Sequence, residues 1–338
     1  MDETVTCIAK APVRISFSGG GTDFPEYFMK YGGCVLSTTI NKYITLKLSK
    51  SKKLNNIRIH LESFKSTKVI KSTTLRRVAN DLYTPIISTL RMFHEIPGLR
   101  LDISSDIKPG NGLGTSSALI VSLIGGLSAC SKARITKEQL AQKAIYLERE
   151  ILGRTGGFQD QYASSFGGFN LMDFSRKDTV SVTPVRILPE TLKNLEDNLL
   201  LFQLKGSRNS SIKQATLVRN ILQSKKVIQI LHLLKRNTYK MQDALRDNNL
   251  NDFAKILHLN WELKKDTSSV ISNNQIDSIY KKALQNGAIG GKLLGAGGGG
   301  CLLLYCPVND QNSLKKSLQT FDGRFIDFKF ENKGFHIL

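Results

Sequence analysis

The chain of 338 residues has no apolar run of about 18 residues, the length that a membrane-spanning helix needs. It also lacks the Gly-Lys-Ser or Gly-Lys-Thr triplet of the common phosphate loop, which excludes a P-loop NTPase. The N-terminus, Met1-Asp2-Glu3-Thr4, has neither the basic start nor the apolar stretch of a signal peptide. We therefore expect a cytoplasmic enzyme, of a length that favours two domains.

Cysteine and histidine are scarce, with five of each. The cysteines stand singly among apolar residues and show no Cys-x-x-Cys spacing; they are Cys7, Cys34, Cys130, Cys301 and Cys306. The histidines show no metal-ligand spacing either. We expect buried free thiols and no zinc site.

Acidic residues are few beside basic ones: 28 Asp and Glu against 48 Lys and Arg give a net charge of +20. The basic residues lie in scattered pairs, such as Lys225-Lys226 and Lys264-Lys265, without interleaved aromatic residues. A nucleic-acid binder usually concentrates its charge on one element, so solvated basic faces are the better interpretation. The positive field favours an anionic substrate such as a nucleotide or a sugar phosphate.

Residues 109–118 read Pro-Gly-Asn-Gly-Leu-Gly-Thr-Ser-Ser-Ala, between a predicted strand (99–107) and a predicted apolar helix (116–131). Glycines let backbone N–H groups approach a ligand closely, and the first turn of a helix has unpaired N–H groups that attract anions. The arrangement predicts a phosphate site, to which Thr115, Ser116 and Ser117 add hydroxyl groups. The alternative is a glycine-rich turn whose hydroxyl residues only cap the next helix.

Another glycine loop comes earlier, where a predicted strand (4–18) runs into Gly19-Gly20-Gly21-Thr22-Asp23. Asp23 follows the glycines, where the backbone leaves room for a ligand, or it caps a short helix predicted over 24–31. Further along, the patterns predict a β-rich run (34–48), a strand pair (57–70) and a helix over 75–95 that Pro85 interrupts.

Two carboxylates follow the central loop. A capping box at Thr136 opens a helix that reaches about residue 152. Glu148 falls on its core-facing side, where a carboxylate needs a partner or a metal. Asp160 follows Gly156-Gly157 at the predicted start of the next helix, as a positioned acid or only as a complement to the helix dipole.

The character of the sequence changes over 188–198, and we place a domain boundary at residue 190. A strand (199–204) and a Gly-Ser-Arg-Asn-Ser-Ser turn that contains Arg208 then precede long helical patterns, with Met241 and Trp261 as core residues. The last glycine loop (290–300) follows a helix and precedes an apolar strand (301–306), which excludes a dinucleotide fold. Alternation predicts a half-buried strand over 324–331.

Three glycine motifs in this order resemble the GHMP kinases, a family that includes galactokinase, homoserine kinase, mevalonate kinase and phosphomevalonate kinase. The motifs are residues 11–23, 109–118 and 292–301, and together they span nearly the whole chain. Within the family, Gly19-Gly20-Gly21-Thr22-Asp23, Gly157-Phe158-Gln159-Asp160-Gln161 and the glycines from 295 to 300 look most like the D-glycero-D-manno-heptose 7-phosphate kinases. Fucokinases share much of the first motif.

The resemblance implies an α+β fold with two domains: residues 1–190, similar to domain 2 of ribosomal protein S5, and residues 191–338, ferredoxin-like. It implies an enzyme that uses ATP and Mg²⁺ to phosphorylate the anomeric hydroxyl of D-glycero-D-manno-heptose 7-phosphate, on the way to GDP-heptose for surface polysaccharides. Alternatives are a kinase of an unphosphorylated sugar such as fucose or galactose, a non-catalytic protein of the same fold, and a nucleic-acid binder. We expect a monomer or homodimer with neither a nucleic-acid nor a membrane partner.

The resemblance also implies roles for single residues. The nucleotide phosphates would lie on the second motif, which comprises Pro109, Gly110, Asn111, Gly112, Leu113, Gly114, Thr115, Ser116 and Ser117. Asp160 would be the base or orient the sugar hydroxyl, and Arg14 would keep Asp160 ionised and offset charge on the γ-phosphoryl group.

Ser116 and Glu148 would hold Mg²⁺, with Glu150 or Glu138 as substitutes for Glu148. The substrate-binding residues would be Gly20, Gly21, Thr22, Asp23, Gly157, Gly297 and Gly298. Arg208 would bind the substrate's own phosphate, because arginine binds phosphate bidentately; a local cap or ion pair is the equal alternative.

Overall fold

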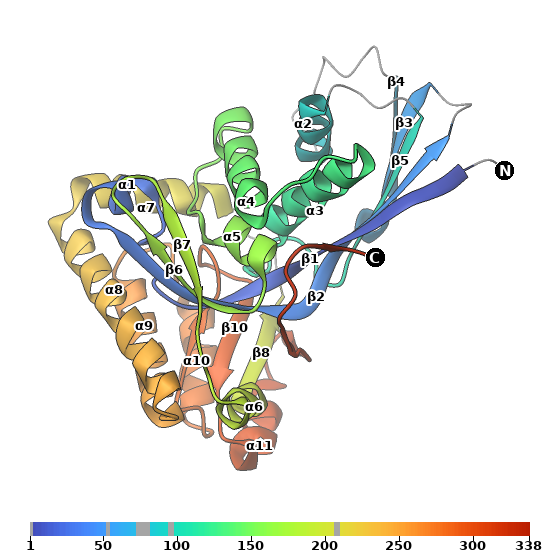
Figure 1. Cartoon of the computed structure of the whole chain (residues 1–338). Coiled ribbons are helices and arrows are strands. Elements are labelled where there is room, and N and C mark those ends of the chain that lie inside the picture. Colours follow the sequence, from blue (N-terminus) through green and yellow to red (C-terminus); the bar gives the residue numbers. More distant parts are fainter. Residues whose placement is uncertain (1–2, 52–54, 72–81, 94–97, 206–209) are drawn as a thin grey trace.

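The computed structural model describes residues 3–51, 55–71, 82–93, 98–205 and 210–338 (Figure 1). The first half contains β1 (Glu3–Ser18), α1 (Pro25–Tyr31), β2 (Gly33–Ser51), β3 (Asn56–Leu61), β4 (Ser66–Lys71), α2 (Thr84–Met92), β5 (Leu99–Ser105), α3 (Thr115–Cys130), α4 (Lys137–Tyr146), α5 (Gln159–Phe166), β6 (Phe169–Phe174) and β7 (Val180–Pro184). The second half contains α6 (Pro189–Asn198), β8 (Leu199–Leu204), α7 (Ser210–Gln223), α8 (Lys225–Arg246), α9 (Leu250–Lys265), α10 (Asn274–Leu284), β9 (Gly290–Leu293), β10 (Cys301–Tyr305), α11 (Gln311–Leu318), β11 (Gly323–Ile326), β12 (Phe330–Glu331) and β13 (His336–Ile337).

The first sheet is built around the long strand β2. Its first half pairs with β6 and its second half with β5, while β1 runs antiparallel along most of its length. The small, apolar helix α3 lies against this sheet, where a Cβ on Gly126 would come within 3.2 Å of Ala9 and Leu48. This close approach places the start of α3, and the glycine loop before it, beside the end of β1.

The second sheet has four described strands in the order β11-β8-β10-β9, all antiparallel. Trp261 of α9 is fully buried in its separate apolar core, and Met241 of α8 is fully buried in the larger core. Figure 1 shows this sheet below the first one, with α8 and α9 along its side. The architecture confirms the α+β class; the boundary at residue 190 stays a prediction.

Three of the expected elements differ from the structure. Residues 324–331 do not form one strand, because β11 joins the second sheet and β12 pairs with β2 of the first. Pro85 does not interrupt a helix: it lies in the first turn of α2, where its missing N–H costs nothing. The residues before Gly295 form the strand β9, so a strand and not a helix directly precedes the glycines.

The chain returns to the first sheet at its C-terminal end. There β12 pairs with β2 and β13 pairs with β1, so that Ile337 lies opposite Ala9. Between the two short strands, the ring of Phe335 covers Gly125 of α3: a Cβ at that glycine would lie 2.2 Å from Cζ of the ring. Residues from both ends of the sequence therefore complete one core (Figure 1).

Candidate active site

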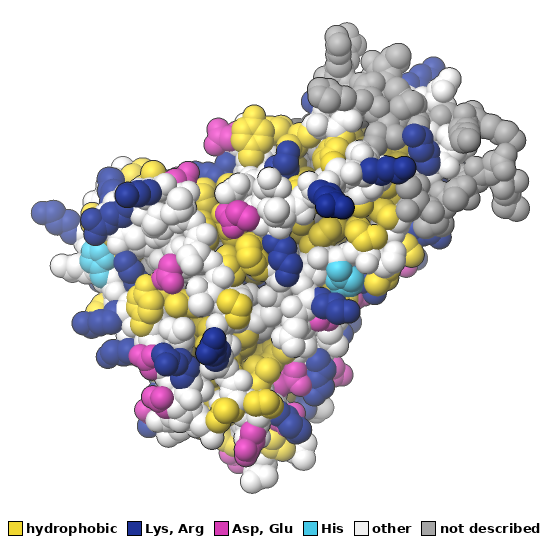
Figure 2. Space-filling model, viewed as in Figure 1, with side chains coloured by type: hydrophobic (Ala, Val, Ile, Leu, Met, Phe, Trp, Pro, Cys, Tyr) yellow, Lys and Arg dark blue, Asp and Glu magenta, His cyan; other side chains and the backbone are white. Residues whose placement is uncertain are grey.

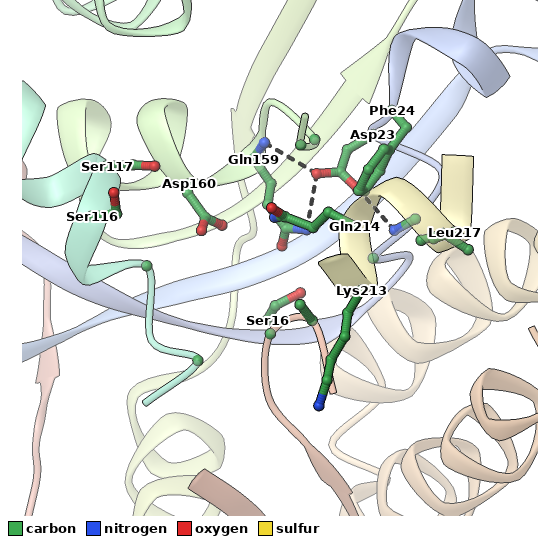
Figure 3. Close-up of a pocket in the computed structure, with 18 of the residues that line it drawn as sticks. Ser16, Asp23, Phe24, Ser116, Ser117, Gln159, Asp160, Lys213, Gln214 and Leu217 are labelled. Atoms are coloured by element: carbon green, nitrogen blue, oxygen red, sulfur yellow. Dashed lines mark hydrogen bonds between the residues drawn. The ribbon is translucent and has the colours of Figure 1, made fainter. Parts of the chain in front are cut away.

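A cavity of about 330 Å³ opens between the two halves of the molecule. It is lined by parts of all three glycine motifs and by residues of α5, α7 and α9 (Figure 3). Its size is in the range of small-ligand sites. In Figure 3, Ser116 and Ser117 lie on one side, Asp23 on the other, and Asp160 between them.

Arg14 and Asp160 form an ion pair in the middle of the cavity. Arg14 donates from Nε and Nη2 to Oδ1 of Asp160 at 2.8 and 2.7 Å, and from Nη1 to the Gly112 carbonyl at 2.5 Å. Both carboxylate contacts use Oδ1, so Oδ2 accepts no hydrogen bond from the part of the protein that the structure describes. Asp160 lies in the first turn of α5, and Oδ2 would be 3.2 Å from a Cβ on Gly114. Asp160, the predicted acid, therefore lies next to the predicted phosphate loop.

The loop before α3 takes its shape from glycine. Gly110, Gly112 and Gly114 all have φ between +74° and +85°, a region that glycine enters without a steric cost. These three glycines line the cavity together with Thr115, Ser116 and Ser117. Pro109, Asn111 and Leu113 do not line it: Leu113 belongs to the apolar core, and the Asn111 carbonyl accepts the N–H of Cys301. No hydroxyl group caps α3, so the alternative of a purely capping role is wrong.

Glu148 is buried in the π-helical turn η3 (Leu147–Ile151) that continues α4. Its carboxylate accepts hydrogen bonds from Ser117 at 2.8 Å, from Ser116 at 3.4 Å and from Gln161. Burial raises the pKa of Glu148, and the hydrogen bonds from Ser117 and Gln161 and the nearby Arg154 oppose that rise. Arg154 lies 3.6 Å from the carboxylate and donates to the Ser116 hydroxyl.

The oxygen atoms of Ser116 and Glu148 are hard ligands of the kind that Mg²⁺ prefers. Glu138 does not line the cavity and accepts a hydrogen bond from Tyr162, and Glu150 is exposed outside the cavity. Among the described residues there is no cluster of three His, Cys, Asp or Glu side chains that could hold a metal alone. A divalent ion at Ser116 and Glu148 would therefore depend on oxygen ligands from the nucleotide.

Asp23 is buried and does not cap α1, so that alternative is wrong. Its carboxylate accepts the N–H of Gly21 at 2.8 Å and the side-chain amide of Gln159 at 2.9 Å. A Cβ on Gly157 would lie 2.0 Å from the same carboxylate, which explains the glycine there. Burial raises the pKa of Asp23, and the charge of Asp160 adds to the effect. The hydroxyl of Ser16 and Oε1 of Gln159 are buried, and neither has a hydrogen-bond partner among the described residues.

The loop 19–23 also holds the remaining predicted residues of the first motif. Gly20 and Gly21 line the cavity. Thr22 does not line it, because its hydroxyl donates to carbonyls at Gly19 and Cys34 and fixes the loop against β2. The predicted contacts of Gly20, Gly21 and Asp23 thus share one wall, and Thr22 supports that wall from behind.

The third glycine motif faces the cavity through Gly295 and Ala296. Gly297 and Gly298 lie behind them: the Gly297 carbonyl accepts the ammonium group of Lys213 at 3.1 Å, and the Gly298 N–H donates to the Ile271 carbonyl. Arg208, the predicted ligand of the substrate phosphate, lies outside the described residues. Lys213 and Gln214, a short distance along α7, line the cavity instead.

No individual role was predicted for Lys264 or Lys292. Both line the cavity, although Lys264-Lys265 was interpreted as part of a solvated face; that interpretation holds for exposed residues such as Lys226 and is wrong for Lys264. Lys264 comes three residues after the buried Trp261 on α9, and this helical spacing was the available signal. Figure 2 shows Lys and Arg side chains spread over the visible face and not gathered in one patch.

None of the helices in the described part of the chain is long and apolar enough to cross a membrane. The cysteines within the described residues are free, and four of the five are buried. Cys7 and Cys130 lie near each other, with their sulfur atoms 3.6 Å apart.

Two family models match the chain: the N-terminal domain of the GHMP kinases over residues 76–168 and the C-terminal domain over residues 241–321. A D-glycero-alpha-D-manno-heptose 7-phosphate kinase of Campylobacter jejuni is 32% identical, over 97% of this chain and 98% of its own. A crystal structure of a D-glycero-D-manno-heptose 1-phosphate kinase from Bacteroides thetaiotaomicron superimposes with a TM-score of 0.81 at 26% identity, covering 98% of both chains. A structure of a putative sugar kinase from Campylobacter jejuni gives 0.80 at 31% identity, covering 100% of this chain and 98% of that one.

The motifs, the two matched domains and the similarity along the whole length agree with one another. A galactokinase structure in complex with galactose, at 17% identity and a TM-score of 0.80, shares the fold alone. The chain therefore belongs to the GHMP kinase family and is a phosphotransferase with an alcohol group as acceptor.

Proposed function

We propose that the protein transfers the γ-phosphoryl group of ATP to the anomeric hydroxyl of D-glycero-D-manno-heptose 7-phosphate and forms the 1,7-bisphosphate. The product would serve the synthesis of GDP-heptose for surface polysaccharides, in the cytoplasm. The 32% identical relative named as a heptose 7-phosphate kinase supports this substrate. The charge of the cavity supports it independently.

The observation that carries the proposal is the excess of positive charge in the cavity. Six basic and three acidic side chains line the cavity. Two of the acids are already paired, Asp160 with Arg14 and Glu148 with Arg154. Asp23 is then the remaining acid, and its charge acts on Lys264 and Lys292; such a field favours an acceptor that carries its own phosphate.

Asp160 would take the proton of the attacking hydroxyl or orient it. The acceptor oxygen would form a bond to the γ-phosphorus, the bond between that phosphorus and ADP would break, and the proton would pass to the carboxylate. Arg14 holds Oδ1 of Asp160, which leaves Oδ2 for the hydroxyl. Its guanidinium would also offset charge on the transferring group, which is the main demand of phosphoryl transfer.

The loop at residues 110–117 would bind the nucleotide phosphates with backbone N–H groups and hydroxyls. Ser116 and Glu148 would hold Mg²⁺, which when bound neutralises charge on the phosphates. Asp23, Gln159 and the Ser16 hydroxyl would bind sugar hydroxyl groups. The unpaired Ser16 Oγ and Gln159 Oε1 favour this arrangement, because buried polar atoms normally have a partner.

A coupled assay of ADP release, with Mg²⁺ and matched pairs of sugars and sugar phosphates, tests the proposal. We expect turnover of heptose 7-phosphate and loss of activity with a chelator. Turnover of a neutral sugar such as fucose or galactose, without turnover of the heptose phosphate, would replace the substrate by the unphosphorylated alternative. ATP binding without turnover of any sugar would favour a non-catalytic protein.

A further inference from the structure

Two lysines from the second half of the chain converge on the first glycine loop. Lys264 of α9 donates a hydrogen bond to the Gly20 carbonyl at 2.8 Å, and Lys292 of β9 donates to the Phe17 carbonyl at 3.1 Å. Lys292 is buried and Lys264 is half-buried, and both line the cavity. Each therefore presents its ammonium group at the same wall as Asp23.

Neither ammonium group is satisfied by the protein. A lysine has three N–H donors, and within the described residues each of these two makes one hydrogen bond, to a neutral carbonyl. Burial lowers the pKa of Lys264 to about 8 and that of Lys292 to about 7; the charges of Lys264 and Arg14 add to the effect on Lys292, and the charge of Asp23 opposes it at both lysines without cancelling it. Two desolvated cations this close together are costly unless a ligand with negative charge compensates them.

We propose that Lys264 and Lys292 form a subsite that binds the phosphate monoester of the acceptor. The inference rests on the proposed function, since it names the residues that would make a phosphorylated acceptor preferable to a neutral one. In this proposal the two lysines, and not Arg208, bind the phosphate of the substrate. Together the two ammonium groups would supply up to four hydrogen-bond donors to a phosphate dianion, beyond those already used on the loop.

The position of the lysines favours the acceptor over the nucleotide as the source of the phosphate. Their carbonyl partners belong to Phe17 and Gly20, next to Asp23 on the acceptor side. Ser116 and Ser117, at the start of α3, lie on the other side of Asp160 (Figure 3). A nucleotide held by α3 would present its γ-phosphate at Asp160, and the acceptor would extend from there toward the lysines.

In the first experiment, inorganic phosphate is titrated into enzyme saturated with Mg²⁺ and a non-hydrolysable ATP analogue, and binding is measured by calorimetry. The analogue fills the nucleotide loop, so the phosphate reports on the second subsite whatever sugar the enzyme uses. We expect phosphate to bind the wild type, and Lys264→Met and Lys292→Met to weaken it about 10- to 100-fold, the range of lost charged hydrogen bonds. Equal binding by wild type and both variants, or none by the wild type, would overturn the subsite.

The second experiment measures kinetics with a phosphorylated acceptor and its unphosphorylated counterpart. We expect both methionine variants to raise KM for the phosphorylated acceptor alone. Lys264→Arg and Lys292→Arg should bring KM most of the way back to the wild-type value. Lys265→Met is the matched control, because Lys265 is the next residue of α9 and pairs with Glu262 outside the cavity. Unchanged affinity for ADP in each variant verifies the fold.

Two results separate the inference from the function on which it rests. If the variants lose affinity for ATP relative to ADP but keep KM for the acceptor, the lysines bind the γ-phosphate and the inference is wrong while the kinase stands. If heptose 7-phosphate is not turned over but inorganic phosphate binding depends on both lysines, the subsite stands and the substrate assignment fails.

Discussion

At the scale of single residues, some side chains of the site belong to a recognisable sequence motif, and others reach the site only through the three-dimensional fold. Arg14, Ser116, Glu148 and Asp160 were predicted from the resemblance, and the structure places all four on one cavity. Lys264 could not be assigned in this way, because nothing in the sequence of α9 shows that it packs beside a glycine loop more than 200 residues away. Its role depends on the fold.

Asp160→Asn tests the acid. The amide keeps the size of the side chain but can neither accept the hydroxyl proton nor balance Arg14, so we expect kcat to fall about 10²- to 10⁴-fold. Calorimetry with an ATP analogue should show nearly unchanged affinity, because the loop at 110–117 is intact. A variant with the wild-type kcat would remove Asp160 from the reaction.

The two lysines predict a pH dependence of phosphate binding to the nucleotide-saturated enzyme. They bind phosphate when protonated, so affinity should fall about tenfold for each pH unit above a pKa of about 7 for Lys292, and more steeply above about 8 for Lys264. A phosphate monoester is a dianion above about pH 6, whereas inorganic phosphate loses its second proton near neutral pH, so the titration of the ligand is included in the fit. The charged groups that face them are Asp23 and Arg14, and burial raises the pKa of Asp23.

The variant Lys264→Arg/Lys292→Arg keeps both charges and should move the fall in phosphate affinity to higher pH. A phosphate affinity that does not depend on pH would contradict the prediction.

The effect of pH on folding stability has the opposite sign. The unfolded chain binds more protons than the folded one between the pKa of about 7 for Lys292 and its usual value of 10.5, so this residue makes the free energy of unfolding rise with pH over that window. In Lys292→Met the free energy of unfolding should no longer rise with pH over that window.

At the scale of elements, the cavity depends on turns that leave no room for side chains. Strands, helices and the capping box at Thr136 were predictable from periodicity and local signals, and the structure has them. The π-helical turn that carries Glu148 was not, because its extra residue per turn follows from packing and not from an apolar pattern. The same limit explains the division of 324–331 between two sheets: alternation predicts a strand but not its partner.

Gly157→Ala tests whether the turn before α5 sets the position of Asp23. The added Cβ would lie 2.0 Å from the Asp23 carboxylate, which must move away. We expect kcat/KM for the acceptor to fall on the order of 10- to 100-fold, as for other misplacements of about 1 Å, with KM for ATP little changed.

Gly156→Ala is the matched neighbour. Its Cβ would first meet the end of the flexible Gln214 side chain at 3.3 Å, so its effect should be much smaller. Equal effects of the two substitutions would show that the spacing to Asp23 does not matter.

At the scale of the whole molecule, the two halves are tied together beside the active site. Asn260 of α9 donates to the hydroxyl of Ser18 at the end of β1, and Thr238 of α8 shares that hydroxyl at 2.7 Å. The family resemblance predicted the two-domain fold. It did not predict that β12 and β13 cross back to the first sheet, because strand partners this far apart leave no mark in a single sequence.

A double-mutant cycle tests the contact of Phe335 with α3. Gly125→Ala should cost about 1–3 kcal/mol of unfolding free energy, because its Cβ would lie 2.2 Å from the ring. In a Phe335→Ala background the ring is gone and alanine is the better helix former by about 1 kcal/mol, so the same substitution should become neutral or stabilising. Urea unfolding of the four proteins gives the interaction energy; additive effects would mean that the ring does not rest on Gly125.

The pairing of β13 with β1 has a consequence for biosynthesis. Until residues 336–337 have left the ribosome, β1 lacks this neighbour, and the nascent chain exposes an open strand edge that other chains could join. The first half is translated early, but its sheet is complete only after β12 and β13 of the second half have emerged and paired with β2 and β1.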